Sequence, residues 1–150
     1  MSKITWKKAI EIAINREIEA ASSYRQLAAK AMEESVRELF LDLAQEEDKH
    51  KEKLEKLDWS NLAEDDSTPP VDLGLTDGLI AESLSPEIPL QDLLVRAAQK
   101  EKQAATFYAS LAQTTKSMRL KRLFRYLEKQ EKSHKLRLEL EYERVFLPED

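Results

Sequence analysis

The sequence contains no cysteine. This absence excludes disulfide bonds, thiol catalysis, iron–sulfur clusters and zinc sites with cysteine ligands. Any redox chemistry must therefore use a bound metal or a borrowed cofactor. Glycine is also scarce, with 2 residues in a chain of 150. Because an all-β fold needs many turns, which usually contain glycine, the shortage favours long helices.

Long apolar runs are missing too, and no basic tract is dense enough to grip phosphates. Without a run of about 18 apolar residues, no transmembrane helix is predicted. The first residues also lack the apolar core of a signal peptide. The net charge of -5 argues against nucleic acid as a partner. We therefore expect a cytoplasmic protein of one domain that binds neither nucleic acid nor membranes.

The sequence repeats itself when it is shifted by 84 positions. Residues 6–57 align with residues 90–141 without a gap, and 15 of the 52 pairs are identical. Within each half, apolar residues recur at alternating intervals of three and four, which places them along one stripe of a helix. Thr5 is a suitable N-cap for the first helix, and Pro89 is tolerated at the start of the third. Helices are predicted near residues 6–31, 34–58, 89–114 and 117–144.

The short joints within each half predict two pairs of antiparallel helices. Residues 59–88 separate the halves and contain Pro69, Pro70, Gly74 and Gly78, which break helices. A segment of about 30 residues can run the length of a bundle, so we interpret it as a long crossover. A disordered linker is the alternative, but apolar residues favour a packed strap. These apolar residues are Val71, Leu73, Leu75, Leu79 and Ile80. The expected fold is an all-α antiparallel four-helix bundle.

Ionisable residues interrupt the apolar stripe of every predicted helix at matching positions. They are Glu17, Glu47, His50, Glu101, Glu131 and His134. Burying four carboxylates without partners costs several kcal/mol each, whereas two divalent cations would balance their charge. The Glu-x-x-His spacing places a carboxylate and an imidazole on one helical face, about one turn apart. Two such motifs, with one glutamate from each of the other helices, form the ligand set of ferritin-like di-iron proteins.

The repeat also selects among the glutamates. Glu46 could pair with His50, but its counterpart in the second half is Gln130. Glu17 and Glu47 keep a carboxylate in both halves. The alternative interpretation is that these glutamates form surface salt bridges and that the histidines are incidental. Because both histidines of the chain fall at the equivalent position, the metal site is favoured.

Six local motifs make the chain resemble the rubrerythrin family of the ferritin-like superfamily, outside the crossover. They are Glu17-x6-Tyr24, Glu47-x-x-His50, Glu101-x6-Tyr108, Glu131-x-x-His134, Leu39-Phe40-x-x-Leu43 and Leu123-Phe124-x-x-Leu127. The resemblance implies a non-haem di-iron oxidoreductase, a homodimer that reduces hydrogen peroxide or dioxygen. It also implies that Glu47 and Glu131 bridge the metals. Glu17 and Glu101 would then be terminal ligands, and His50 and His134 would each bind one metal.

The sequence departs from that family in two ways. Rubrerythrins proper carry a cysteine-ligated rubredoxin module, so this chain is expected to take electrons from an external donor such as a rubredoxin. They also carry an extra glutamate one turn from the third-helix ligand, tied to efficient peroxide reduction. Here the positions one turn either side of Glu101 are Ala98 and Ala104. The second hypothesis is therefore a ferritin-like ferroxidase that handles Fe(II), and the third is a bundle whose metals are only structural.

Two tyrosines and the identity of the metal complete the sequence-based hypothesis. Tyr24 and Tyr108 lie two turns beyond Glu17 and Glu101 on the same helical faces. They are expected to hydrogen-bond a ligand carboxylate or to lie beside the oxidant. The alternative is that they fill the core with a satisfied hydroxyl. Oxygen and imidazole ligands fit iron or manganese, whereas zinc would bind without redox activity.

Overall fold

A computed structural model describes residues 4–58, 65–70 and 88–147. These residues form four α-helices and no strand. The helices are α1 (Trp6–Lys30), α2 (Glu34–Glu55), α5 (Leu90–Thr114) and α6 (Met118–Phe146). The expected all-α bundle of two helix pairs is confirmed.

Short polar side chains begin two of the helices. The Thr5 side chain accepts a hydrogen bond of 3.1 Å from the backbone N–H of Lys8 at the start of α1. Ser117 does the same for Leu120 at the start of α6, at 3.2 Å. Each of these bonds satisfies one of the backbone donors that a helix start leaves without a partner. Pro89 occupies the N-cap position of α5.

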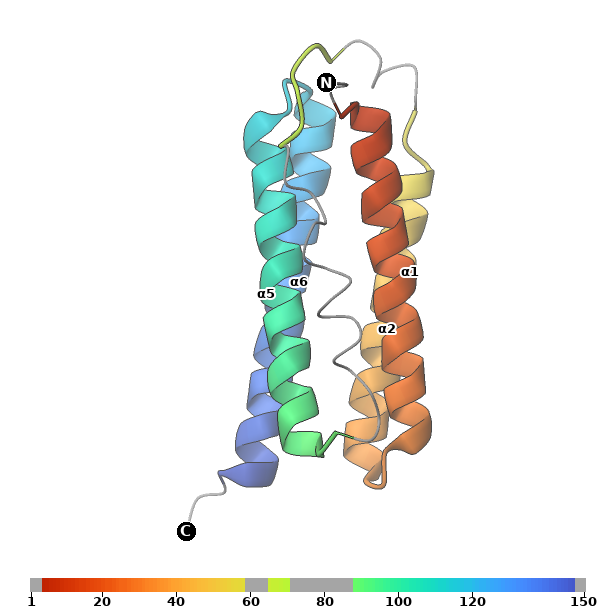
Figure 1. The fold of residues 1–150 in the computed structure, drawn as a ribbon, viewed down its shortest axis with the longest axis vertical. Coiled ribbons are helices and arrows are strands. Elements are labelled where there is room, and N and C mark those ends of the chain that lie inside the picture. The colour runs from red at the N-terminus through yellow and green to blue at the C-terminus, as the bar shows by residue number, and fades with distance from the viewer. Residues whose placement is uncertain (1–3, 59–64, 71–87, 148–150) are drawn as a thin grey trace.

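The two helix pairs lie side by side, with α1 and α2 on one side and α5 and α6 on the other (Figure 1). The pairs contact one another through α2 and α6. Helix α2 ends and helix α5 begins at opposite ends of the bundle (Figure 1), as the predicted crossover requires. Most of that crossover, with the five apolar residues of the expected strap, lies outside the described residues.

The described part of the crossover, residues 65–70, is attached at one end of the bundle. The indole N–H of Trp6 donates to the backbone oxygen of Ser67 at 3.0 Å. The Thr115 hydroxyl donates to Asp65 Oδ2 at 2.6 Å. Pro69 is buried. These contacts join the start of α1 to the turn between α5 and α6.

The core consists of two apolar clusters. One contains Trp6, Ile10, Leu54, Phe124 and neighbouring residues. The other contains Leu27, Phe40, Leu94, Leu138 and neighbouring residues. In each helix the predicted ligand residues lie between the positions that contribute to the two clusters. The bundle therefore encloses a layer of ionisable side chains with apolar packing on both sides. In the part of the chain that the structure describes, no helix is long and apolar enough to cross a membrane.

Candidate metal centre

The six predicted ligand residues are all buried. None exposes more than 3% of its surface, and His134 exposes 0%. They come from all four helices, so the site exists only when both helix pairs are assembled. Carboxylates are almost never fully buried unless they are paired, which makes this layer unusual for a bundle core.

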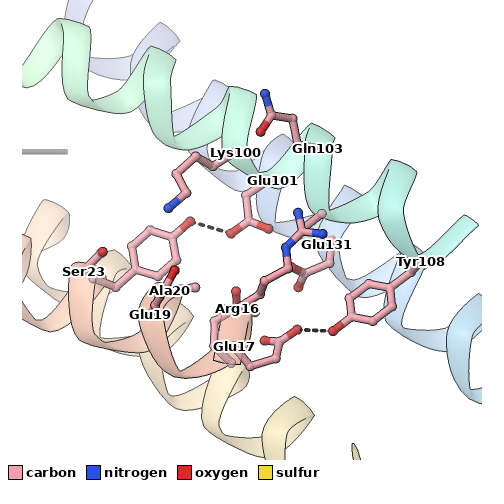
Figure 2. Close-up of a pocket in the computed structure, with 13 residues that line it drawn as sticks. Arg16, Glu17, Glu19, Ala20, Ser23, Lys100, Glu101, Gln103, Tyr108 and Glu131 are labelled. Atoms are coloured by element: carbon pink, nitrogen blue, oxygen red, sulfur yellow. Dashed lines mark hydrogen bonds between the residues drawn. The ribbon is translucent and has the colours of Figure 1, made fainter. Parts of the chain in front are cut away.

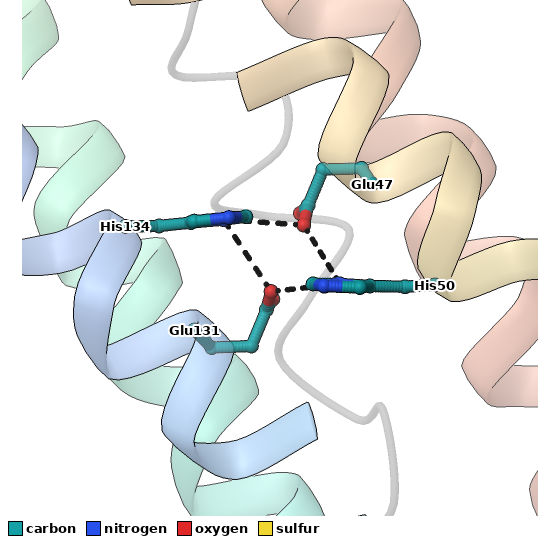
Figure 3. A group of neighbouring side chains, drawn as sticks. All are labelled: Glu47, His50, Glu131 and His134. Atoms are coloured by element: carbon teal, nitrogen blue, oxygen red, sulfur yellow. Dashed lines mark ion pairs between the residues drawn. The ribbon is translucent and has the colours of Figure 1, made fainter. Parts of the chain in front are cut away.

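Four of these residues form the centre of the site. The imidazole rings of His50 and His134 are nearly parallel, with ring centroids 5.5 Å apart and planes inclined by 9°. The Glu47 and Glu131 carboxylates lie between the rings (Figure 3). Nδ1 of His50 is 3.1 Å from Glu47 Oε1 and 3.2 Å from Glu131 Oε1. Nδ1 of His134 is 3.2 Å and 3.5 Å from the same two oxygens. Each of the two carboxylates therefore faces both histidines.

The other two glutamates divide the site into halves. Glu17 Oε2 is 3.5 Å from Nδ1 of His50, and Glu101 Oε2 is 3.6 Å from Nδ1 of His134. Each histidine is thus paired with one glutamate of its own, while Glu47 and Glu131 are shared. This geometry is what the bridging and terminal roles would require, but those roles stay predictions.

Two tyrosines hold the outer glutamates across the bundle. The Tyr24 hydroxyl donates to Glu101 Oε1 at 2.5 Å, and the Tyr108 hydroxyl donates to Glu17 Oε1 at 2.6 Å (Figure 2). Each tyrosine reaches a glutamate of the other helix pair. Burial raises the pKa of both phenols, and the neighbouring carboxylates raise it further. Both tyrosines therefore stay protonated and act as hydrogen-bond donors.

The buried side-chain atoms without a hydrogen-bond partner are concentrated in this layer. Among the described residues there are seven such atoms, and all belong to the six predicted ligands. They are Glu17 Oε2, Glu47 Oε1, His50 Nδ1, Glu101 Oε2, Glu131 Oε1 and both ring nitrogens of His134. An unsatisfied buried polar atom costs about 1–3 kcal/mol, so such a concentration is not expected from packing alone. Converging oxygen and nitrogen atoms with free lone pairs fit a site for metal cations.

Burial and neighbouring charges raise the pKa values of several groups in the site. Burial raises the pKa of Glu47 and of Glu131, and the charges of the other glutamates raise it further. Burial alone would lower the pKa of His50, but the nearby carboxylates of Glu131, Glu17 and Glu47 raise it well above the ordinary value. The raised pKa values favour the protonated forms of these groups, so a cation that binds here competes with protons for the site.

A narrow pocket reaches the site between α1 and α5 (Figure 2). Its volume is about 40 Å³, where a single water needs roughly 10–15 Å³ of such space. It therefore has room for a small oxidant or a few waters. Ala20 and Ala104 line it and leave the space open, and Arg16 and Lys100 also line it. Sequence reasoning missed these two cations, although the repeat aligns them directly before the outer glutamates.

Glu46 lies beside the site although the repeat argued against it as a ligand. Its Oε1 is 3.5 Å from Nε2 of His134, and its Oε2 is 2.5 Å from Arg137 Nη1. Burial tends to raise the pKa of Glu46, but the Arg137 hydrogen bond and the His134 charge hold it below the ordinary value. Glu46 is therefore an ionised neighbour of His134 rather than a member of the central cluster.

Comparison with known proteins identifies the family. The rubrerythrin family model matches residues 4–58 and 92–150, which include all six predicted ligands. The chain belongs to the rubrerythrin family. This family suggests iron for the buried cluster of carboxylates and histidines, which could bind a metal.

A solved structure has the same fold. It is described as a hypothetical protein, Pfu-1136390-001, from Pyrococcus furiosus. The two chains are 29% identical, and their superposition has a TM-score of 0.70. The match covers 95% of this chain and 90% of the archaeal one. No curated protein matches the chain.

Proposed function

We propose that the buried cluster binds two iron ions and that the protein reduces hydrogen peroxide or dioxygen with electrons from an external donor. One observation carries the metal part of this proposal: seven buried atoms without hydrogen-bond partners converge in one layer and belong to six carboxylate and imidazole side chains. Such ligands suit iron or manganese, and iron is the metal that the family suggests. Glu47 and Glu131 would bridge the ions. Glu17 with His50, and Glu101 with His134, would complete the two halves.

A pair of bound ferrous ions would supply two electrons and open coordination positions for an oxidant. Hydrogen peroxide takes up two electrons and two protons and yields two waters. The chain has no cysteine and therefore no iron–sulfur centre of its own. A separate electron donor such as a rubredoxin would return the electrons.

The protein's own side chains orient the ligands and restrict access. Tyr24 and Tyr108 each occupy one oxygen of an outer glutamate, which leaves the other oxygen directed to the centre. The apolar clusters on both sides of the ligand layer exclude bulk water. The pocket between α1 and α5 has a volume of about 40 Å³, which suits a small oxidant. This small volume supports peroxide or dioxygen as the substrate.

A specific observation favours a second candidate, a ferroxidase that oxidises Fe(II) and passes it on. The resemblance associates efficient peroxide reduction with an extra glutamate one turn from the third-helix ligand. Ala98 and Ala104 occupy these positions around Glu101, and Ala104 lines the pocket. The centre would then have the plain six-ligand set that ferroxidase chemistry uses.

Stopped-flow absorbance of anaerobically iron-loaded protein separates the two candidates. We expect the ferrous protein to be oxidised faster by hydrogen peroxide than by dioxygen, with return to the ferrous state when a reduced rubredoxin is added. Faster oxidation by dioxygen with accumulation of ferric iron would support the ferroxidase instead. No oxidation by either reagent would contradict both.

The proposed homodimer has its own support on α6. Leu136 and Leu140 expose 55% and 53% of their surfaces, one turn apart on that helix. A second copy that covers them would remove this apolar surface from water. Light scattering of the metal-loaded protein measures the oligomeric state, and a dimer too small to enclose a mineral core would also argue against iron storage.

A further inference from the structure

The Glu46 carboxylate is fixed on the outer side of His134. Its Oε1 lies 3.5 Å from Nε2, while the Nδ1 atom on the other side of the ring faces Glu47 and Glu131. Glu46 Oε2 is 2.5 Å from Arg137 Nη1, which holds the carboxylate in place. Glu46 thus contacts the imidazole without competing for the centre of the site.

The Nε2 atom of His134 needs an acceptor once Nδ1 binds a cation. A neutral imidazole carries one proton, and binding through Nδ1 leaves that proton on Nε2. His134 exposes 0% of its surface, and its Nε2 has no hydrogen-bond partner among the described residues. Bulk water does not reach a donor buried to this degree, and Glu46 Oε1 is the acceptor that the structure places beside it. A small movement would bring Glu46 Oε1 from 3.5 Å to hydrogen-bond length.

The other half of the repeat does not carry this carboxylate. The residue that matches Glu46 is Gln130, whose amide has no charge. His50 instead lies near the Tyr126 ring, with ring centroids 6.4 Å apart and planes inclined by 80°. The Lys53 ammonium lies 5.2 Å over the centre of that ring. The surroundings of the two histidines therefore differ, although the repeat keeps the six predicted ligands.

We propose that Glu46 is a positioning residue that strengthens binding of the metal ion held by His134. The two metal ions therefore bind with unequal affinity, and the His134 half of the site binds its ion first. A carboxylate that accepts the outer N–H of a ligating histidine fixes its tautomer and ring orientation and raises its basicity. Removing such a partner typically weakens metal binding by about 10- to 100-fold. The inference rests on the proposed metal centre but is independent of which oxidant the protein reduces.

The experiment is a Co(II) titration followed by calorimetry and by the visible absorbance of the bound metal. Wild-type protein is expected to bind two ions in two steps of different affinity. Glu46→Gln keeps the shape of the side chain and should weaken one step by about 10- to 100-fold. Glu52→Gln removes the same charge from an exposed position of α2 and should change neither step. His134→Ala should remove the step that Glu46→Gln weakens, which assigns that step to one half of the site.

Gln130→Glu is a second test that loss of folding cannot mimic. It places a carboxylate at the position matched to Glu46, so the weaker step should become tighter and approach the stronger one. Unequal steps that respond to neither substitution at position 46 nor at position 130 would overturn the proposal. Equal steps in the wild type, or equal weakening of both steps by Glu46→Gln, would overturn it as well.

The same titration separates this inference from the proposed function. A wild-type protein that binds no Co(II) would contradict the metal centre itself, and the role of Glu46 with it. Two Co(II) steps that Glu46→Gln leaves unchanged would contradict only the role of Glu46. Two unequal, Glu46-dependent steps in a protein whose iron form does not react with peroxide or dioxygen would contradict only the oxidoreductase.

Discussion

Glu47 and Glu131 differ from the outer glutamates because each lies within 3.5 Å of both histidine Nδ1 atoms. A shared ligand should matter to both metal ions, whereas a histidine should matter mainly to one. Because the difference depends on which histidines each carboxylate faces, single substitutions can test it.

The shared and unshared ligands should give different metal stoichiometries. Glu47→Ala or Glu131→Ala should abolish the binding of both ions. His50→Ala should lose or weaken one ion and leave the His134 half. Elemental analysis after metal loading and desalting measures the ratio. Two tightly bound ions in Glu47→Ala would refute its bridging role, and unchanged affinity and stoichiometry in His50→Ala would refute that ligand.

The tyrosine hydroxyls should contribute to stability through the carboxylates that they hold. Tyr24→Phe removes the donor to Glu101 and leaves a buried carboxylate oxygen without a partner. We expect a loss of about 1–3 kcal/mol in the free energy of unfolding. Urea denaturation of the metal-free protein measures it. Tyr108→Phe is the matched variant in the other half, and Tyr126→Phe, at an exposed position, should change the stability little. Wild-type stability in both buried variants would show that the tyrosines only fill space.

Among the helices, α1 and α5 enclose a pocket that reaches the site. Small side chains on both helices leave this pocket, and the α2–α6 side brings the two pairs into contact. Under the proposed function, a small oxidant would enter through this pocket, and the residues of α1 and α5 that line it would set its route. Those residues can be changed without replacing a predicted ligand.

Filling the pocket should slow the reaction without preventing metal binding. Ala104→Leu adds a branched side chain to the pocket lining one turn from Glu101. We expect the rate of oxidation by peroxide or dioxygen to fall at least about tenfold, because the larger side chain obstructs entry of the oxidant. A tenfold fall corresponds to an increase of about 1.4 kcal/mol in the activation free energy. Gln99→Leu adds the same side chain at an exposed position of α5 and is the control. Stopped-flow oxidation at equal iron content measures both. Equal rates in wild type and Ala104→Leu would place the route elsewhere.

Much of this element-level structure could be predicted from the sequence. The 84-residue repeat and the three–four spacing of apolar residues predicted the bundle, because both are local properties of amphipathic helices. The end of α2 is harder to predict from the sequence. The apolar spacing predicts a helix to residue 58, whereas α2 ends at Glu55. Helix ends depend on backbone hydrogen-bond partners, which periodicity does not show. The tyrosine bonds also escaped exact prediction, because each crosses to the other helix pair. Glu46 was set aside because the repeat has no carboxylate at Gln130, and only the packed structure shows it beside His134.

At the scale of the whole molecule, a buried layer of ionisable groups links folding to pH and to metal. The pKa values of Glu47, Glu131, His50 and His134 are all raised in the metal-free protein. Burial is the largest cause for the glutamates, while nearby carboxylates outweigh burial for the histidines. The folded chain therefore binds more protons than the unfolded chain above the ordinary glutamate value of 4.5. A native state that binds more protons loses stability as pH rises.

We therefore expect opposite pH dependences for the metal-free and metal-loaded proteins. The stability of the metal-free protein should fall between about pH 5 and 8, by about 1.4 kcal/mol per pH unit for each extra proton held by the native state. Metal affinity should rise over the same range, because the ligands must lose those protons. Urea denaturation and metal titration across this range measure the two trends. The double variant Glu47→Gln and Glu131→Gln should flatten the first trend, and a metal-free protein that becomes more stable towards pH 8 would contradict this account.

The central claim is that the buried layer is a two-metal centre, and iron stoichiometry tests it most directly. Protein loaded with Fe(II) under anaerobic conditions and then desalted should retain two iron ions per chain. Glu47→Ala, treated in the same way, should retain none. Wild-type protein that keeps no stoichiometric iron would contradict the account. A Glu47→Ala variant that keeps as much iron as the wild type would contradict it as well.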